Sequence, residues 1–148
     1  MGQQIETMVQ RLRRFARALT HDGEGADALV LEALASTEEK RFEFNRLLTF
    51  ILARRREQEE LHTQIRPVRP AVKPLPSSRP DILRAFERLP LADREVIALI
   101  SVEGLSYEDA AAILALREEA FIARLTRARA AFARHVDGER HAVLRIVK

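Results

Sequence analysis

The fold of this 148-residue chain is decided by Leu89–Val136, which reads LPLADREVIALISVEGLSYEDAAAILALREEAFIARLTRARAAFARHV. Apolar residues recur here at helical spacing, first in Val96–Ile100 and again in Ala110–Leu114. Gly104 ends the first of these helices. Ser106, with an acidic residue three positions later, has the spacing of an N-cap that begins the second.

The last helix of this stretch is predicted to be basic. After a short turn near Ala115 and Leu116, residues 121–136 contain no Asp or Glu, and positive charge comes from Arg124, Arg127, Arg129 and Arg134. Two short helices followed by a basic one are the layout of a helix-turn-helix, in which the final helix enters the major groove of DNA. The pattern therefore indicates a nucleic-acid-binding protein.

Composition agrees with this interpretation. Residues 1–61 carry 10 basic and 11 acidic side chains, whereas residues 62–148 carry 15 and 11, so the positive balance lies with the predicted helix-turn-helix. The chain has no cysteine, which excludes disulfides and thiolate metal sites and suits a reducing cytoplasm. No apolar run approaches the roughly 20 residues of a membrane span, so we expect a soluble, cytoplasmic protein without membrane contact.

The chain is predicted to divide into two all-α domains. Five of the six prolines fall in residues 62–80, a density that excludes a helix and favours an extended, mobile tether. Residues 1–61 hold three helical patterns, and residues 81–148 hold about four. We expect a helical domain over 1–61, a Pro-rich linker over 62–80 and a helix-turn-helix domain over 81–148, with the free protein sampling several domain arrangements.

Both halves resemble an extracytoplasmic-function (ECF, group 4) sigma-70 factor. In the C-terminal half, LPLADREVIALISVEGLSYEDAAAILAL and RLTRARAAF are close to the family's LPxxxREVxxLxxxEGLSYEEAAxILGV and SRLxRARxxL. In the N-terminal half, LRRFARALTHDGEGADALVLEALAS resembles LRRFARxLTxxxxxADDLVQETLLR. The resemblance implies a region 2 domain that binds core RNA polymerase and the −10 element, and a region 4 domain that contacts the −35 element of promoter DNA.

The resemblance also implies a polymerase-binding surface that includes Asp27 and Glu32. The family carries two successive acidic residues and a Gln there, but this chain has Ala28 and Leu31 at the second acidic position and at the Gln. The family's third helix carries a Trp and an Arg-Asn pair near the −10 surface, whereas this chain has no Trp and has Ala53–Arg54. Phe42, Phe44 and Phe50 are alternative sources of aromatic rings, although the spacing of Phe50 favours the core.

The DNA-binding residues implied by the resemblance lie on the last helix and are Arg124, Thr126, Arg127 and Arg129. The polar pair that the family directs into the major groove is replaced by Ile122 and Ala123. These two side chains offer a base edge little beyond contact with a thymine methyl group. The arginines can contact phosphate without reading sequence.

The same departures resemble those in PhyR-type response regulators, whose sigma-like domain binds the anti-sigma factor NepR and so releases the true sigma factor. Their second helix tends to read DAxV, as Asp27–Val30 does here, and their opening LRRYARALT is nearly Leu12–Thr20. A PhyR protein also carries a receiver domain, which this sequence does not contain.

We therefore predict an ECF-type sigma factor of the general stress response, with core RNA polymerase, promoter DNA and an anti-sigma factor as partners. The alternative is a sigma mimic that binds a NepR-like anti-sigma factor and does not read DNA. No catalytic triad, paired-carboxylate or phosphate-loop signature occurs, so we expect no enzyme activity and no cofactor. The four histidines lack the spacing of a metal site.

Overall fold

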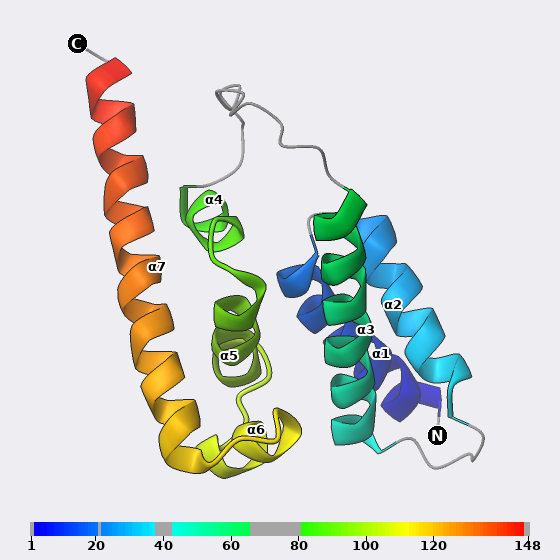
Figure 1. The fold of residues 1–148 in the computed structure, drawn as a ribbon. Helices are drawn as coiled ribbons and strands as arrows, with labels where there is room; N and C mark the ends of the chain where they lie inside the picture. Colours follow the sequence, from blue (N-terminus) through cyan, green and yellow to red (C-terminus); the bar gives the residue numbers. More distant parts are fainter. Residues whose placement is uncertain (1, 21, 38–42, 66–80, 147–148) are drawn as a thin grey trace.

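Seven helices make up the described part of the computed structural model, which covers residues 2–20, 22–37, 43–65 and 81–146. The first three helices form one half of the molecule and the last four form the other (Figure 1). All regular structure in the described ranges is helical, which confirms the predicted all-α class. The helices are α1 Gly2–Leu19, α2 Gly23–Ala35, α3 Phe44–Ile65, α4 Asp81–Glu87, α5 Leu91–Ser101, α6 Tyr107–Ile113 and α7 Glu118–Ile146.

The N-terminal half is built around one apolar face from each of its helices. The predicted stripe of α1 is fully buried at Leu12, Phe15 and Leu19. The first six residues of α1 are exposed, so its apolar face meets the core only from Met8 onward. The facing core residues are Ala26, Leu29, Val30 and Ala33 of α2 and Leu47, Leu48, Ile51 and Leu52 of α3.

The C-terminal half contains the predicted helix-turn-helix. Gly104 adopts a left-handed φ of 65° after the end of α5. The Ser106 side chain accepts a hydrogen bond from the backbone N–H of Asp109 at 3.1 Å and so caps the start of α6. The long helix α7 packs on α4, α5 and α6 (Figure 1). Its residues Phe121, Leu125 and Ala128 are buried.

The turn between α6 and α7 is a Schellman motif with alanine at its left-handed position. The N–H of Ala115 donates to the carbonyl of Ala112 at 3.1 Å, and the N–H of Leu116 donates to that of Ala111 at 2.9 Å. Ala115 has a φ of 54°, which brings its Cβ close to the following carbonyl and is costly for an L-residue. The turn that directs α7 is therefore strained at one residue.

Two helices run further than the sequence indicated. Helix α3 continues to Ile65, so the predicted linker start at His62 is wrong. Its charged end is held by pairs such as Arg55–Glu59 at 2.9 Å. Helix α7 continues to Ile146, past the basic stretch that ends at Val136. The rest of the predicted linker, residues 66–80, and the candidate ring of Phe42 lie outside the described residues.

The two halves pack against each other through α1 on α5 and α3 on α6. Their buried apolar residues form one continuous hydrophobic cluster across the boundary. The structure has one packed arrangement of the two halves, and the expected sampling of several arrangements stays a prediction. Charged residues also form hydrogen bonds across this boundary.

Ala115→Gly should stabilise the protein. Glycine removes the Cβ penalty at the left-handed position, and after its larger loss of chain entropy a net gain of about 0.5–1 kcal/mol remains in the free energy of unfolding. Urea denaturation measures the change. The control is Ala123→Gly at an exposed position of α7, which should instead cost about 1 kcal/mol. A destabilising Ala115→Gly would show that the turn is not strained.

Candidate functional site: the groove between the two halves

A buried carboxylate of α5 ties the C-terminal half to the N-terminal half. Glu95 has a side chain that is 1% exposed and accepts two hydrogen bonds from Arg56 of α3. The Nε and Nη2 atoms of Arg56 lie 2.9 and 2.7 Å from the two carboxylate oxygens, which is a bidentate pair. This pair raises the pKa of Arg56, since the hydrogen bond to Glu95 outweighs the effect of burial.

A second buried carboxylate crosses the same boundary. Glu103 follows the end of α5, has a side chain that is 1% exposed and accepts a hydrogen bond from Nη2 of Arg11 at 3.0 Å. The guanidinium of Arg11 also lies over the ring of Phe44, 4.1 Å from its centroid, which fixes it in place. Burial raises the pKa of Glu103, and the positive charges of Arg11 and Arg14 only partly oppose this.

The carboxyl end of α1 forms the third connection. The carbonyl of Leu19 accepts a hydrogen bond from Nε of Arg55 at 2.8 Å and another from Nη1 of Arg94 at 3.3 Å. Arg55 belongs to α3 and Arg94 to α5, so both halves cap the negative end of the same helix dipole. Burial has the largest effect on the pKa of Arg94 and lowers it, and the positive charge of Arg55 lowers it further.

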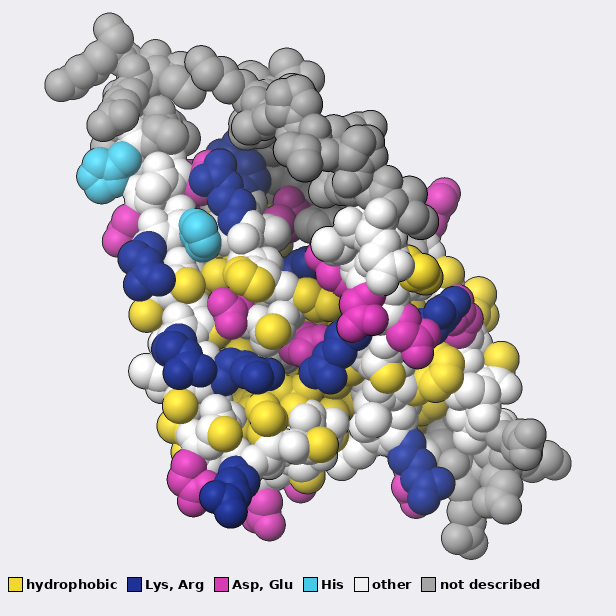
Figure 2. Space-filling view, in the orientation of Figure 1, with side chains coloured by type: hydrophobic (Ala, Val, Ile, Leu, Met, Phe, Trp, Pro, Cys, Tyr) yellow, Lys and Arg dark blue, Asp and Glu magenta, His cyan; other side chains and the backbone are white. Residues whose placement is uncertain are grey.

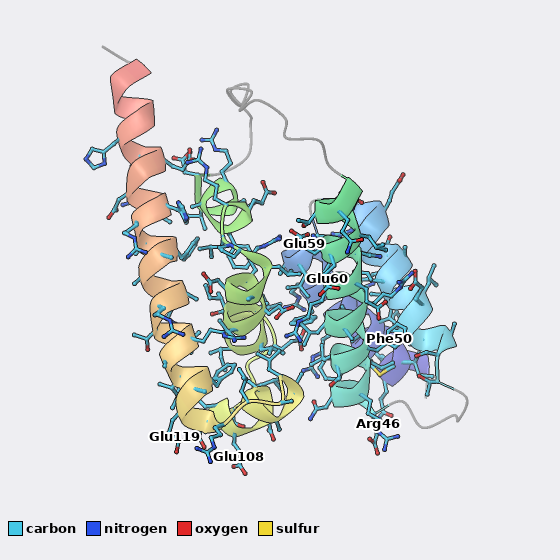
Figure 3. All side chains as sticks on the ribbon, viewed as in Figure 1. Arg46, Phe50, Glu59, Glu60, Glu108 and Glu119 are labelled. Atoms are coloured by element: carbon cyan, nitrogen blue, oxygen red, sulfur yellow. The ribbon has the colours of Figure 1, made fainter. Side chains whose placement is uncertain are left out.

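A groove of about 410 Å³ opens beside these contacts, between α3 and the helix-turn-helix. Its floor is apolar, and its rim carries charges of both signs. Glu59 and Glu60, labelled in Figure 3, come from α3. On the face seen in Figure 2, basic side chains run in a row from α7 toward the middle of the molecule, beside exposed hydrophobic atoms. The lining residues are Arg56, Glu59, Glu60, Leu91, Ala92, Glu95, Leu114, Leu116 and Arg124.

The structure separates the arginines predicted to bind DNA. Arg124 is half-buried and lines the groove, whereas Arg127 and Arg129 are exposed on α7. At 100° per residue, Arg127 lies about 60° around the helix from Arg124, but Arg129 lies about 160° from Arg127. The Thr126 hydroxyl donates to the carbonyl of Ile122 at 2.9 Å. Arg124 and Arg127 therefore lie on neighbouring faces, and Arg129 points elsewhere.

The first turn of α7 is acidic and then apolar. Glu118 and Glu119 are exposed there, and Ile122 and Ala123 are exposed one turn later. Glu119 lies at the same end of the molecule as Glu108, at the start of α6 (Figure 3). The leading end of the helix thus presents negative charge and methyl groups in place of hydrogen-bond donors.

The two acidic residues predicted to contact polymerase are engaged within the chain. Asp27 pairs with Nε of Arg13 at 3.1 Å, and Glu32 pairs with Nε of Arg54 at 2.7 Å. The Glu32 carboxylate, followed by that of Glu57, raises the pKa of Arg54. Between these pairs the surface of α2 is apolar, with Leu31 67% exposed.

The buried charges of α5 were not predicted from the sequence, although a signal was present. Glu95 stands four residues after Leu91 and four before Leu99, which places it on the apolar stripe of the helix. A carboxylate at such a position is buried and requires a cationic partner. Which arginine supplies it depends on tertiary packing between helices that are distant in sequence.

Two family models match the sequence. A model described as sigma-70 region 4 matches residues 79–132, and one described as the sigma2 domain of PhyR matches residues 5–49. The two matched segments are thus similar to domains of sigma-70 family proteins, in the same order along the chain. Sigma-70 factors are not enzymes, which agrees with the expectation of no enzyme activity, and the helix-turn-helix of α5–α7 lies within the region 4 match. Among curated proteins no match is found.

Two solved structures share the fold of this chain. The sigma factor RpoE from Bartonella quintana, in complex with the anti-sigma factor NepR, is 26% identical with a TM-score of 0.65. The alignment covers 92% of this chain and 96% of RpoE. CnrH, in complex with the cytosolic domain of CnrY, has a TM-score of 0.66 at 21% identity, with 93% of this chain and 87% of CnrH covered. The second likeness concerns the fold alone.

Metal clusters and membrane-spanning helices are both absent from the described part of the chain. No cluster of three or more His, Asp or Glu side chains there could hold a metal ion. None of the helices over these residues combines the length and the apolarity needed to cross a membrane.

Glu103→Gln should change how stability depends on pH. Because the pKa of Glu103 is raised in the folded state, the folded protein binds this proton more tightly than the unfolded chain, which titrates near 4.5. Protonated Glu103 therefore stabilises the folded wild type, and this contribution to the free energy of unfolding is lost as pH rises from below 4.5 through the raised pKa. Glutamine does not titrate and makes no such contribution.

Urea denaturation of both proteins between about pH 4 and about pH 7 tests this prediction. The other carboxylates titrate alike in both proteins, so the difference between wild type and Glu103→Gln isolates this group. We expect the stability of the wild type relative to the variant to decrease as pH rises. An increase over the same range would mean that the Arg11 charge outweighs burial.

Proposed function

We propose that the protein is an ECF-type sigma factor that directs core RNA polymerase to stress promoters and is sequestered by an anti-sigma factor of the NepR kind. One observation carries the proposal: both halves and their order match, nearly end to end, a sigma factor that binds NepR. In this function α2 binds the polymerase clamp through Asp27 and Glu32. Region 4 binds the −35 element through Arg124, Thr126, Arg127 and Arg129.

The groove between the halves is the proposed anti-sigma site. Its apolar floor, with Leu91, Leu114 and Leu116, fits the apolar face of a helix laid between the two domains. Its charged rim favours a partner helix that carries both signs of charge at its edges. A partner bound there contacts both halves at once and fixes their arrangement.

A second candidate is the sigma mimic, which binds the anti-sigma factor and does not read DNA. Exposed Leu31 on α2 and exposed Ile122 and Ala123 on α7 favour it, because these surfaces bind polymerase and bases in a working sigma factor. The match of residues 5–49 to the sigma2 domain of PhyR supports it as well. Both candidates use the same groove, so anti-sigma binding alone does not separate them.

In vitro transcription separates the two. With core polymerase, the protein should start a transcript from a stress promoter, and added NepR-type anti-sigma factor should suppress it. Ala92→Glu adds a charge at an exposed position of the groove lining that a bound partner helix would cover. It should weaken suppression about tenfold or more, because burying an unpaired charge is costly. The control is Ala133→Glu, an exposed position on α7 outside the groove lining, which should be suppressed like the wild type.

The contrary outcome has two forms. A protein that starts no transcript but displaces a true sigma factor from its anti-sigma factor is the mimic. A protein that does neither is bound by a different partner, and the proposal fails.

DNA binding by the full-length chain should be weak and dominated by phosphate contacts. Each neutralised phosphate contributes a slope of roughly −0.9 in log K against log salt, and Arg127→Ala should reduce that slope by about one unit. The loss should be equal on all duplex sequences, since Ile122 and Ala123 read no base edge. Fluorescence anisotropy over a salt series measures both quantities. Tight binding to one sequence at physiological salt would contradict this prediction.

A further inference from the structure

The boundary between the two halves contains buried charged residues to which the proposed function assigns no role of their own. Three groups at or after α5 are almost inaccessible to solvent: Arg94 is 3% exposed as a residue, and the side chains of Glu95 and Glu103 are each 1% exposed. All three form their hydrogen bonds with the other half of the molecule. Their partners are the Leu19 carbonyl, Arg56 and Arg11.

We propose that these contacts form a latch, defined as Arg56–Glu95, Arg11–Glu103 and Arg94–Leu19, that keeps the free protein closed. A buried carboxylate cannot lose its cationic partner without being hydrated or protonated. In the closed arrangement the neighbouring helices exclude water from Glu95 and Glu103. Separation of the halves must therefore break the three contacts together, because each of them joins the same two bodies.

The closed arrangement also determines what α7 can present. Arg124 is half-buried and lines the groove beside Glu95 and Arg56, at the boundary between the halves. Separation of the halves would expose more of it to an external phosphate. The latch thus inhibits region 4 within the same chain, and this consequence rests on the proposed DNA-binding function. The latch itself does not rest on that function and can be tested without DNA.

Single-molecule energy transfer between the halves tests the latch in the absence of any partner. The chain has no cysteine, so Ala35→Cys on α2 and Ala133→Cys on α7, both exposed, accept the two dyes. We expect one dominant high-transfer population. Arg56→Gln leaves the buried Glu95 without its counter-charge and should raise the ratio of open to closed molecules about tenfold or more.

A matched control and a rescue make the test specific. Arg46 forms the same kind of pair with Glu43 within one half, but both side chains are largely exposed, so Arg46→Gln should leave the ratio unchanged (Figure 3). Adding Glu95→Gln to Arg56→Gln removes the orphaned charge and should restore much of the closed population. A packing defect would not be rescued in this way.

Three results would overturn the proposal. The first is a wild-type chain that already samples a broad range of transfer efficiencies. The second is an Arg56→Gln variant as closed as the wild type. The third is a double variant at least as open as Arg56→Gln. Far-UV circular dichroism confirms that each variant is folded, and Arg11→Gln, which orphans Glu103, provides an independent second measurement.

Discussion

The burial of Glu95 is the constraint on which the rest of this structure depends. A carboxylate on the apolar stripe of α5 can remain charged only if a cation reaches it, and Arg56 does so with two parallel hydrogen bonds. A bidentate pair fixes direction as well as distance. It therefore fixes how α3 lies relative to α5, and with α3 the whole N-terminal half. The apolar contacts between the halves are not directional in this way.

A buried ion pair need not increase overall stability, because desolvation of both charges offsets most of their attraction. The raised pKa of Glu103 illustrates this, since burial outweighs the favourable field of Arg11. Such pairs penalise every arrangement in which a carboxylate is buried without its arginine. In a two-domain protein this selects one closed geometry from the many that an apolar boundary alone permits. The groove exists because that geometry holds α3 and α5 at a fixed separation.

The sequence was sufficient to predict the helices but not to predict how they pack against one another. The apolar stripes, the Ser106 cap and the turn at Ala115 are local signals, and the structure has each of them. The end of α3 was placed too early because a run of charges was interpreted as the end of a helix, whereas pairs four residues apart stabilise it. Contacts such as Arg11 with Glu103, separated by 92 residues, leave no periodic trace in the sequence. The position of Arg124 in the groove depends on those contacts and was likewise beyond prediction.

The placement of Arg124 bears on the proposal that one helix serves both a protein partner and DNA. Phe121, Leu125 and Ala128 occupy the face of α7 that packs on the core, so the remaining faces are divided between the groove and the solvent. Arg124 stands at the boundary between these two faces, and Arg127 stands on the solvent side. With Ile122 and Ala123 in place of polar readers, the solvent face retains charge and has little capacity for base recognition. Any preference for particular promoters must then come from residues outside α7 or from partners. As the proposed anti-sigma site, the groove shaped by both halves would then be the more selective surface of the molecule.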